Sequence, residues 1–304
     1  MNTVTRPKGR PGEPSPAIAA PALIYLTVII GVPIVIVVMY SLLSRDRFGV
    51  GVTTPFTVDA YVRLLFEEQL SGIREFDVTY LRVLWTSFSL AGLTTVLCIV
   101  LSVPIGVWIA MQPARRRPLL VFLVTVPFWT NTLIRTYAFL IILNDNGPIN
   151  TALEATGLVS DPLPLLYNDF ATGVGMVAVF LPFMILPIYA SAEKFDFRLA
   201  EAAYDLGAKR VTVFRRIVLP AIRPGILAGT ALVLIPAMGS FLQPDLLGGG
   251  KTLMIGNLVQ QQFAASRNWP FGAALSVLLL IVTFVAVLMV SRSLRRSGQQ
   301  VRLL

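Results

Sequence analysis

The sequence predicts an all-α membrane protein with six transmembrane helices. Hydrophobic residues make up 55% of the 304 residues, charged residues only 13%, and the mean hydropathy is +0.74. These proportions are far from those of a soluble domain. The charged residues lie in the gaps between long apolar runs and do not form one patch, so the net charge of +9 does not indicate a nucleic-acid-binding protein.

Six apolar runs are long enough to cross a bilayer, whose hydrocarbon core of roughly 30 Å needs about 20 helical residues. They cover residues 17–43, 83–111, 119–143, 172–192, 226–247 and 271–291. The first run is too long for the apolar region of a cleaved signal peptide. We therefore expect a disordered, proline-rich tail over residues 1–16, a transmembrane domain over residues 17–293 and a C-terminal tail over residues 294–304.

The distribution of Lys and Arg predicts the orientation of the chain. Seventeen of these residues lie in the two termini and in the segments that follow the second and fourth runs, whereas only seven lie in the alternate segments. Cytoplasmic loops carry an excess of positive residues. The sequence therefore predicts a multi-pass membrane protein with both termini and the polar block at residues 193–225 in the cytoplasm.

This polar block contains signals for two short helices. Asp196 is suited to cap a first helix that runs to about Leu206, and Gly207 is suited to the left-handed position that ends it. A second helix is expected to stop at Pro220, with Pro224 opening the next span.

The first helix of the block has a small apolar face. Helical spacing places Leu199, Ala202, Ala203 and Leu206 on one side and Arg198, Glu201 and Asp205 on the other. Small side chains allow the backbone of a partner to approach closely, so we expect a docking surface here. The alternative is an amphipathic helix that lies on the lipid headgroups, with its arginines holding anionic lipid.

The third and fifth runs are the candidates for a transport path. Proline interrupts five of the six runs, and a carbonyl that loses its donor inside a membrane must find a partner or line a cavity. The candidate path residues are Trp129, Asn131, Arg135, Pro236, Gly239 and Asp245. The alternatives are that the prolines are structural kinks and that Arg135 pairs with Asp245.

No catalytic or metal site is expected in this chain. The sequence has no His, and its single Cys98 lies inside the second run. The GGGKT run at residues 248–252 lacks the first glycine of a phosphate-binding loop, because position 245 is Asp, and it follows an apolar helix rather than a strand.

The block EAAYDLGAKRVTVFRRIVLPAIRP at residues 201–224 resembles the cytoplasmic coupling loop of ABC-importer permeases. Further runs resemble the spermidine/putrescine permease group of these importers: PFWTNTLIRTYA (127–138), LPFMILPIYASAEKFD (181–196), LIPAMGSF (234–241), DLLGGGK (245–251), IGN (255–257) and NWPFGAA (268–274). The resemblance covers most of residues 118–290 and is weaker over the first 80.

The resemblance implies a type I ABC importer permease arrangement within a heteromeric complex. Glu201 to Gly207 would form a coupling helix seated on a cytoplasmic ATPase dimer, which would bind the ATP and Mg. The other implied partners are a second permease, an extracytoplasmic solute-binding protein and membrane lipid. The implied solute is a polyamine, and the ten acidic residues in segments 45–80 and 144–170 favour a cation. The alternatives are an ABC permease for another small organic solute, or a secondary transporter, which could share six kinked spans.

Overall fold

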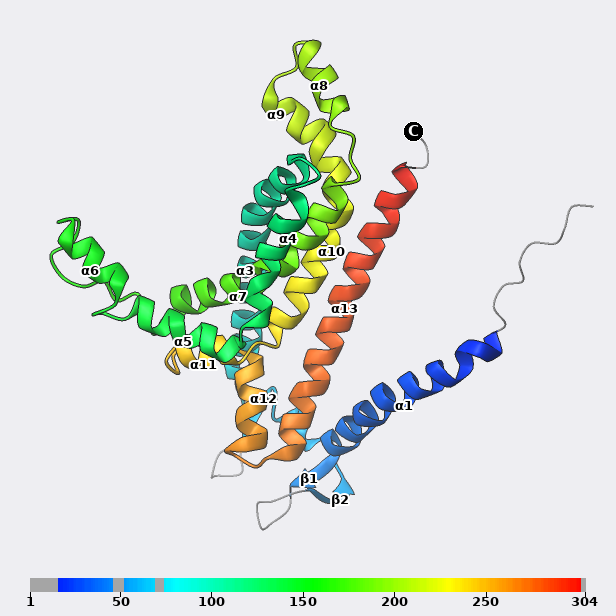
Figure 1. Cartoon of the computed structure of the whole chain (residues 1–304). Helices are drawn as coiled ribbons and strands as arrows, with labels where there is room; N and C mark the ends of the chain where they lie inside the picture. Colours follow the sequence, from blue (N-terminus) through cyan, green and yellow to red (C-terminus); the bar gives the residue numbers. More distant parts are fainter. Residues whose placement is uncertain (1–15, 46–51, 69–73, 302–304) are drawn as a thin grey trace, which may run out of the picture.

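In the computed structural model, which describes residues 16–45, 52–68 and 74–301, helices α3, α7 and α10 form the centre of an elongated bundle (Figure 1). The helices are α1 (Pro16–Ser41), α2 (Asp59–Val62), α3 (Thr79–Met111), α4 (Arg117–Thr125), α5 (Thr132–Leu143), α6 (Pro148–Ala155), α7 (Asp169–Ala192), α8 (Arg198–Asp205), α9 (Arg210–Val213), α10 (Leu219–Met238), α11 (Leu242–Leu247), α12 (Ile255–Ala264) and α13 (Trp269–Val301). A 3₁₀ turn, η1 (Val126–Trp129), follows α4, and a π turn, η2 (Phe214–Val218), follows α9.

The all-α prediction is confirmed for the membrane part of the chain. Five helices are long and apolar enough to cross a membrane, and α4 with η1 forms a bent pair with α5 and α6 that can supply the sixth span. The tail predicted over residues 1–16 lies outside the described residues except for Pro16, where α1 begins. At the other end α13 continues as a helix to Val301, through most of the predicted C-terminal tail.

Two small hairpins were not predicted. Strand β1 (Leu43–Arg45) pairs with β2 (Val52–Phe56), and β3 (Phe66–Glu68) pairs with β4 (Arg74–Phe76), both antiparallel. They lie in the segment between the first two spans, where the sequence has no apolar run. Helices α1 and α13 meet beside β1 and β2, and they diverge from there (Figure 1).

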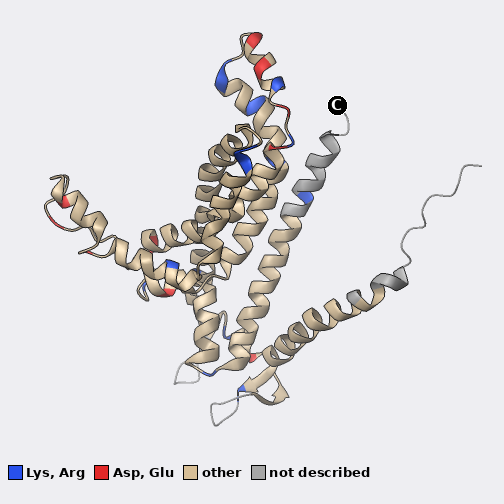
Figure 2. Ribbon diagram, in the orientation of Figure 1, with Lys and Arg blue, Asp and Glu red and all other residues tan. Residues whose placement is uncertain are grey.

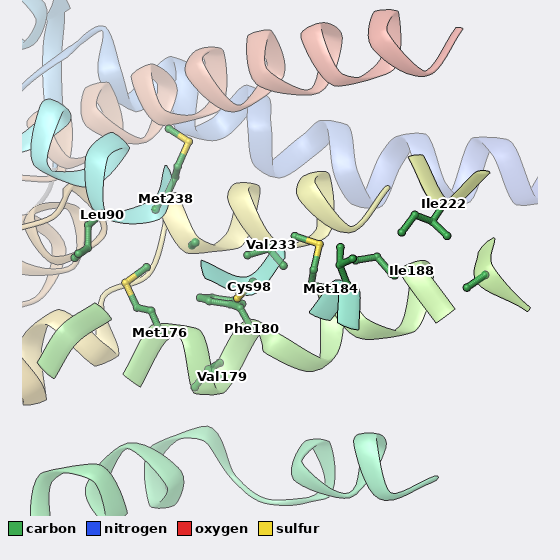
Figure 3. Close-up of a cluster of buried hydrophobic side chains, with 14 of the residues drawn as sticks. Leu90, Cys98, Met176, Val179, Phe180, Met184, Ile188, Ile222, Val233 and Met238 are labelled. Atoms are coloured by element: carbon green, nitrogen blue, oxygen red, sulfur yellow. The ribbon is translucent and has the colours of Figure 1, made fainter. Parts of the chain in front are cut away.

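The core of the bundle lies where α3, α7 and α10 cross (Figure 3). Its largest fully buried side chains include Met176, Met184 and Ile188 of α7. Small residues let these helices approach closely, as is common between membrane helices. A Cβ at Gly225 of α10 would overlap the carbonyl oxygen of Pro187, and one at Gly106 of α3 would lie 2.9 Å from the Ile188 side chain.

Two of the predicted spans are not continuous. The third, predicted over residues 119–143, is bent by 89° between Trp129 and Thr132. The fifth, predicted over residues 226–247, ends as a helix at Met238, and α11 is a separate helix. By contrast, α1, α3 and α7 continue through their prolines, because isolated prolines are tolerated where neighbouring helices satisfy the freed groups.

Candidate functional site

The first predicted helix of the polar block is present as α8. Asp196 accepts a hydrogen bond from the Arg198 N–H at 3.1 Å, which caps the start of the helix as predicted. The helix ends at Asp205, and Gly207 follows with φ +81°, the left-handed conformation expected there. Among the described residues nothing lies within 4 Å of a Cβ built at Gly207, so that part of the chain does not cover this end of α8.

The apolar face of α8 is exposed. Leu206 is 89% exposed and Leu199 is 58% exposed, whereas Ala200 is the one buried residue of the helix. Ala202 is exposed and Ala203 is half-buried. The charged side chains of Glu201 and Asp205 are exposed as well. Helix α8 therefore presents both apolar and acidic groups at the far end of the bundle, where charged residues concentrate (Figures 1 and 2).

The second helix of the block does not stop where it was predicted to stop. The chain remains helical from Arg210 to Met238, through Pro220 and Pro224. The π turn η2 lies directly before Pro220. Proline has no N–H and collides with the preceding turn of a regular helix, and such local widening lets a helix pass a proline. The part of the polar block from Arg210 onward is therefore continuous with the fifth span, and α8 precedes it across the turn at residues 206–209.

The break in the third span places Trp129, Asn131 and Arg135 close together. Asn131 caps α5, since its side-chain oxygen accepts from the Leu133 N–H at 2.8 Å. Trp129 is 75% exposed and packs edge-on against Phe122, with ring centroids 5.5 Å apart. Asn131 thus has a local structural role, while the exposed ring of Trp129 remains available to a solute or a partner.

Arg135 bridges the break. Its guanidinium donates to the carbonyl oxygens of Pro127 and Thr130, the latter at 3.2 Å. Within the described residues its Nε is buried without a hydrogen-bond partner. Asp245 is exposed in the first turn of α11 and makes no ion pair with Arg135 in the described structure. The alternative of an Arg135–Asp245 pair is therefore wrong for this conformation.

The two broken spans meet at a buried polar contact that the sequence analysis did not identify. Gln243 of α11 is 2% exposed, and its amide nitrogen lies 3.5 Å from the hydroxyl of buried Thr136 on α5. The hydroxyl of Ser240 donates to the other end of the same amide. The sequence signal for this contact was Gln243 itself, a polar residue inside the fifth apolar run that follows the break at Pro236 and Gly239.

The predicted break near Pro236 is also a close packing point. Gly239 ends α10, and its carbonyl lies so near Gly256 of α12 that a Cβ at Gly256 would collide with it. The Asn257 amide donates to the Phe241 carbonyl at 2.8 Å. The Phe241 carbonyl, between α10 and α11, thus accepts a hydrogen bond from α12.

Comparison with known families places these features in context. Residues 102–298 match the model of the binding-protein-dependent transport system inner membrane component. The chain is 41% identical over 279 residues to the spermidine/putrescine transport system permease protein PotB of Escherichia coli, covering 92% of this chain and 97% of that protein. It is 40% identical to PotB of Haemophilus influenzae, covering 90% and 91% of the two chains. The inner membrane ABC transporter permease protein YdcU of Escherichia coli is 30% identical, covering 81% and 79%.

Solved structures share the fold at low sequence identity. A bacterial alginate ABC transporter in complex with an alginate-bound periplasmic protein has a chain with a TM-score of 0.69 and 19% identity, covering 92% of this chain and 93% of that one. The MetNI methionine ABC transporter in an inward-facing conformation has a TM-score of 0.54 and 16% identity, covering 71% and 95%.

Proposed function

We propose that this chain, which belongs to the binding-protein-dependent transport system inner membrane components, imports a polyamine as a permease subunit of an ABC importer. The assignment of a polyamine as the substrate rests on the 41% identity to a spermidine/putrescine permease over nearly the full length of both chains. A secondary transporter is set aside because the family depends on a binding protein. The family also places the chain in the inner membrane.

The proposed contact with the ATPase is α8, from Glu201 to Gly207. The exposed side chains of Leu206 and Leu199 supply an apolar contact, and Glu201 and Asp205 supply charge around it. The ATP and Mg would be bound by that partner, and this chain would carry no catalytic group. Since the helix is continuous from Arg210 to Met238, a movement of the ATPase against α8 would be transmitted to the fifth span.

The remaining parts of the proposal concern orientation and the other partners. Both termini and α8 would face the cytoplasm, because the positive residues concentrate there. A second permease would complete the path, and an extracytoplasmic binding protein would deliver the solute on the opposite side.

The solute path is proposed along the broken third and fifth spans. The exposed aromatic face of Trp129 and the carboxylate of Asp245 can attract a protonated amine. Asn131, Arg135, Pro236 and Gly239 would shape this path, since they form or cap the two breaks.

The experiment is uptake by the complete complex in proteoliposomes. Labelled spermidine and putrescine are expected to accumulate with ATP and binding protein, whereas an amino acid and an organic anion of similar size are not. Glu201→Lys is expected to abolish ATPase co-purification and uptake. Glu154→Lys makes the same charge change on exposed α6, away from α8, and should leave ATPase co-purification intact. Uptake of a different organic solute would overturn the polyamine assignment, and normal uptake by Glu201→Lys would overturn the role of α8.

A further inference from the structure

An open cavity of about 440 Å³ lies between the start of α4 and the end of α7. It is lined by Ala114, Arg117, Pro118, Val121, Phe122, Tyr189 and Glu193. Helix α4 begins at the end of the bundle that carries α8 and α9, where Lys and Arg gather (Figures 1 and 2). The cavity therefore lies at the boundary between the apolar spans and the charged loops.

The charged groups that line the cavity are one ion pair, and the loop that leads into it is positively charged. Arg117 makes a long ion pair with Glu193, at 3.7 Å, and donates from Nε to the Gln112 carbonyl at 2.7 Å. Arg115 and Arg116 precede Arg117 in the chain but do not line the cavity; they are exposed, and their side chains make no hydrogen bond or ion pair within the described residues. The loop beside the cavity therefore supplies two positive charges in addition to the Arg117–Glu193 pair.

The opposite wall of the cavity is apolar and continues along the membrane face of α4. Phe122 is 45% exposed and Leu123 is 54% exposed, and no residue of α4 is buried. A ligand that fits both parts has an anionic head and an apolar tail. Basic pockets between membrane helices on the cytoplasmic side have the chemistry that binds acidic phospholipid head groups.

We infer that this cavity binds an anionic phospholipid of the cytoplasmic leaflet, with its phosphate at Arg115–Arg117 and an acyl chain along Val121 and Phe122. The leaflet assignment rests on the proposed function and its orientation. Glu193 directly follows the last residue of α7 and lies three residues before Asp196 at the start of α8. The lipid phosphate competes with Glu193 for the Arg117 guanidinium. The bound lipid therefore lies next to the start of the polar block at residues 193–225.

The test is direct binding of fluorescent phosphatidylglycerol to the purified complex in neutral detergent, without ATP or solute. Phosphatidylcholine with the same chains is the lipid control, and glycerol phosphate tests whether a soluble phosphate suffices. Arg115→Gln with Arg116→Gln is expected to weaken binding roughly thirtyfold, since each arginine near an anionic lipid surface contributes about fivefold. Both side chains are exposed, so this double variant should fold. Glu193→Gln frees Arg117 and should tighten binding.

The matched control is Arg215→Gln with Arg216→Gln, which removes the same charge from η2 on the same side. Lipid affinity within about twofold of the unaltered protein in this control supports a defined site. Equal losses in the two double variants, or equal binding of the two lipids, would overturn it, because bulk charge or apolar contact would then explain the result.

Competition by glycerol phosphate would assign the cavity to a soluble anion, and no binding of any probe would show that a partner chain fills it. Because the readout needs neither transport nor ATP, failed polyamine uptake with intact lipid binding would separate the two proposals.

Discussion

The contact between α7 and α10 and the exposed helix α8 both rely on small residues, but with opposite consequences. Gly225 and Gly229 of α10 lie against Pro187 and Met184 of α7, where an added Cβ would overlap its neighbours. Around Gly207 nothing lies within 4 Å. The first region is complete within this chain, whereas the second is a surface that the chain leaves uncovered.

The difference shows that small residues indicate close approach without saying to what. In the bundle they bring two helices of the same chain together, as between other membrane helices. In α8 they leave a smooth face with Leu206 89% exposed, which the described residues of this chain do not bury. Substitutions in the two regions should therefore fail in different assays, one in folding and the other in assembly.

The largest effect is expected for Gly225→Leu in the α7–α10 contact. Four added carbons have no space against the Pro187 backbone, and overpacking of this kind costs about 1–3 kcal/mol or more. We expect little folded protein in the membrane, measured by fluorescence-detected size exclusion. The matched control is Gly92→Leu on α3, where nothing lies within 4 Å of an added Cβ, and it should remain monodisperse. Equal behaviour of the two variants would refute the close packing of α7 on α10.

The next effect is expected at the break in the third span. Arg135→Gln removes the charged donor from the Pro127 and Thr130 carbonyls, and a hydrogen bond to a charged group contributes about 1.5–3 kcal/mol. The melting temperature of the purified complex should fall. Adding Asp245→Asn should not restore it, because the two residues do not pair and independent changes add to within about 0.5 kcal/mol. Recovery in the double variant would instead support an ion pair in another conformation.

Some features of the fold and the site could be predicted from the sequence, and others could not. Apolar length identified the spans, and Asp196 and Gly207 marked the two ends of α8, because both signals depend on local chemistry. The 89° bend of the third span could not be predicted, because Pro127 is one of many prolines and most of the others lie in continuous helices. The contact of Gln243 with Thr136 depends on how two distant segments pack, which periodicity does not encode.

A smaller and more local effect is expected for Gly207→Val. The left-handed conformation at φ +81° costs about 1–2 kcal/mol for a residue with a Cβ. Folding of the bundle should be unchanged, whereas retention of the ATPase on purification should drop. Gly207→Asn is the matched control, because Asn tolerates this conformation better, and it should retain more ATPase than the Val variant. Loss of the folded permease in the Val variant would mean that α8 belongs to the bundle after all.

The smallest effect, on the melting temperature at acidic pH, is expected at two aspartates that accept hydrogen bonds at helix starts. They are Asp77 before α3 and Asp196 before α8. Asp77 accepts hydrogen bonds from the Thr79 hydroxyl at 2.7 Å and from the Thr79 N–H at 2.8 Å. These bonds, the hydroxyl first, hold the pKa of the Asp77 carboxyl below its usual value. A lowered pKa in the folded state means that the cap stabilises α3 fully above the usual Asp value of about 3.9 and loses this contribution as the pH falls through the folded value. Asp77→Asn should flatten that acidic part of the melting profile below about pH 5, while Asp196→Asn, on a helix outside the bundle, should leave it unchanged. If the two Asn variants altered the profile equally, the cap on α3 would have no special part in the stability of the bundle.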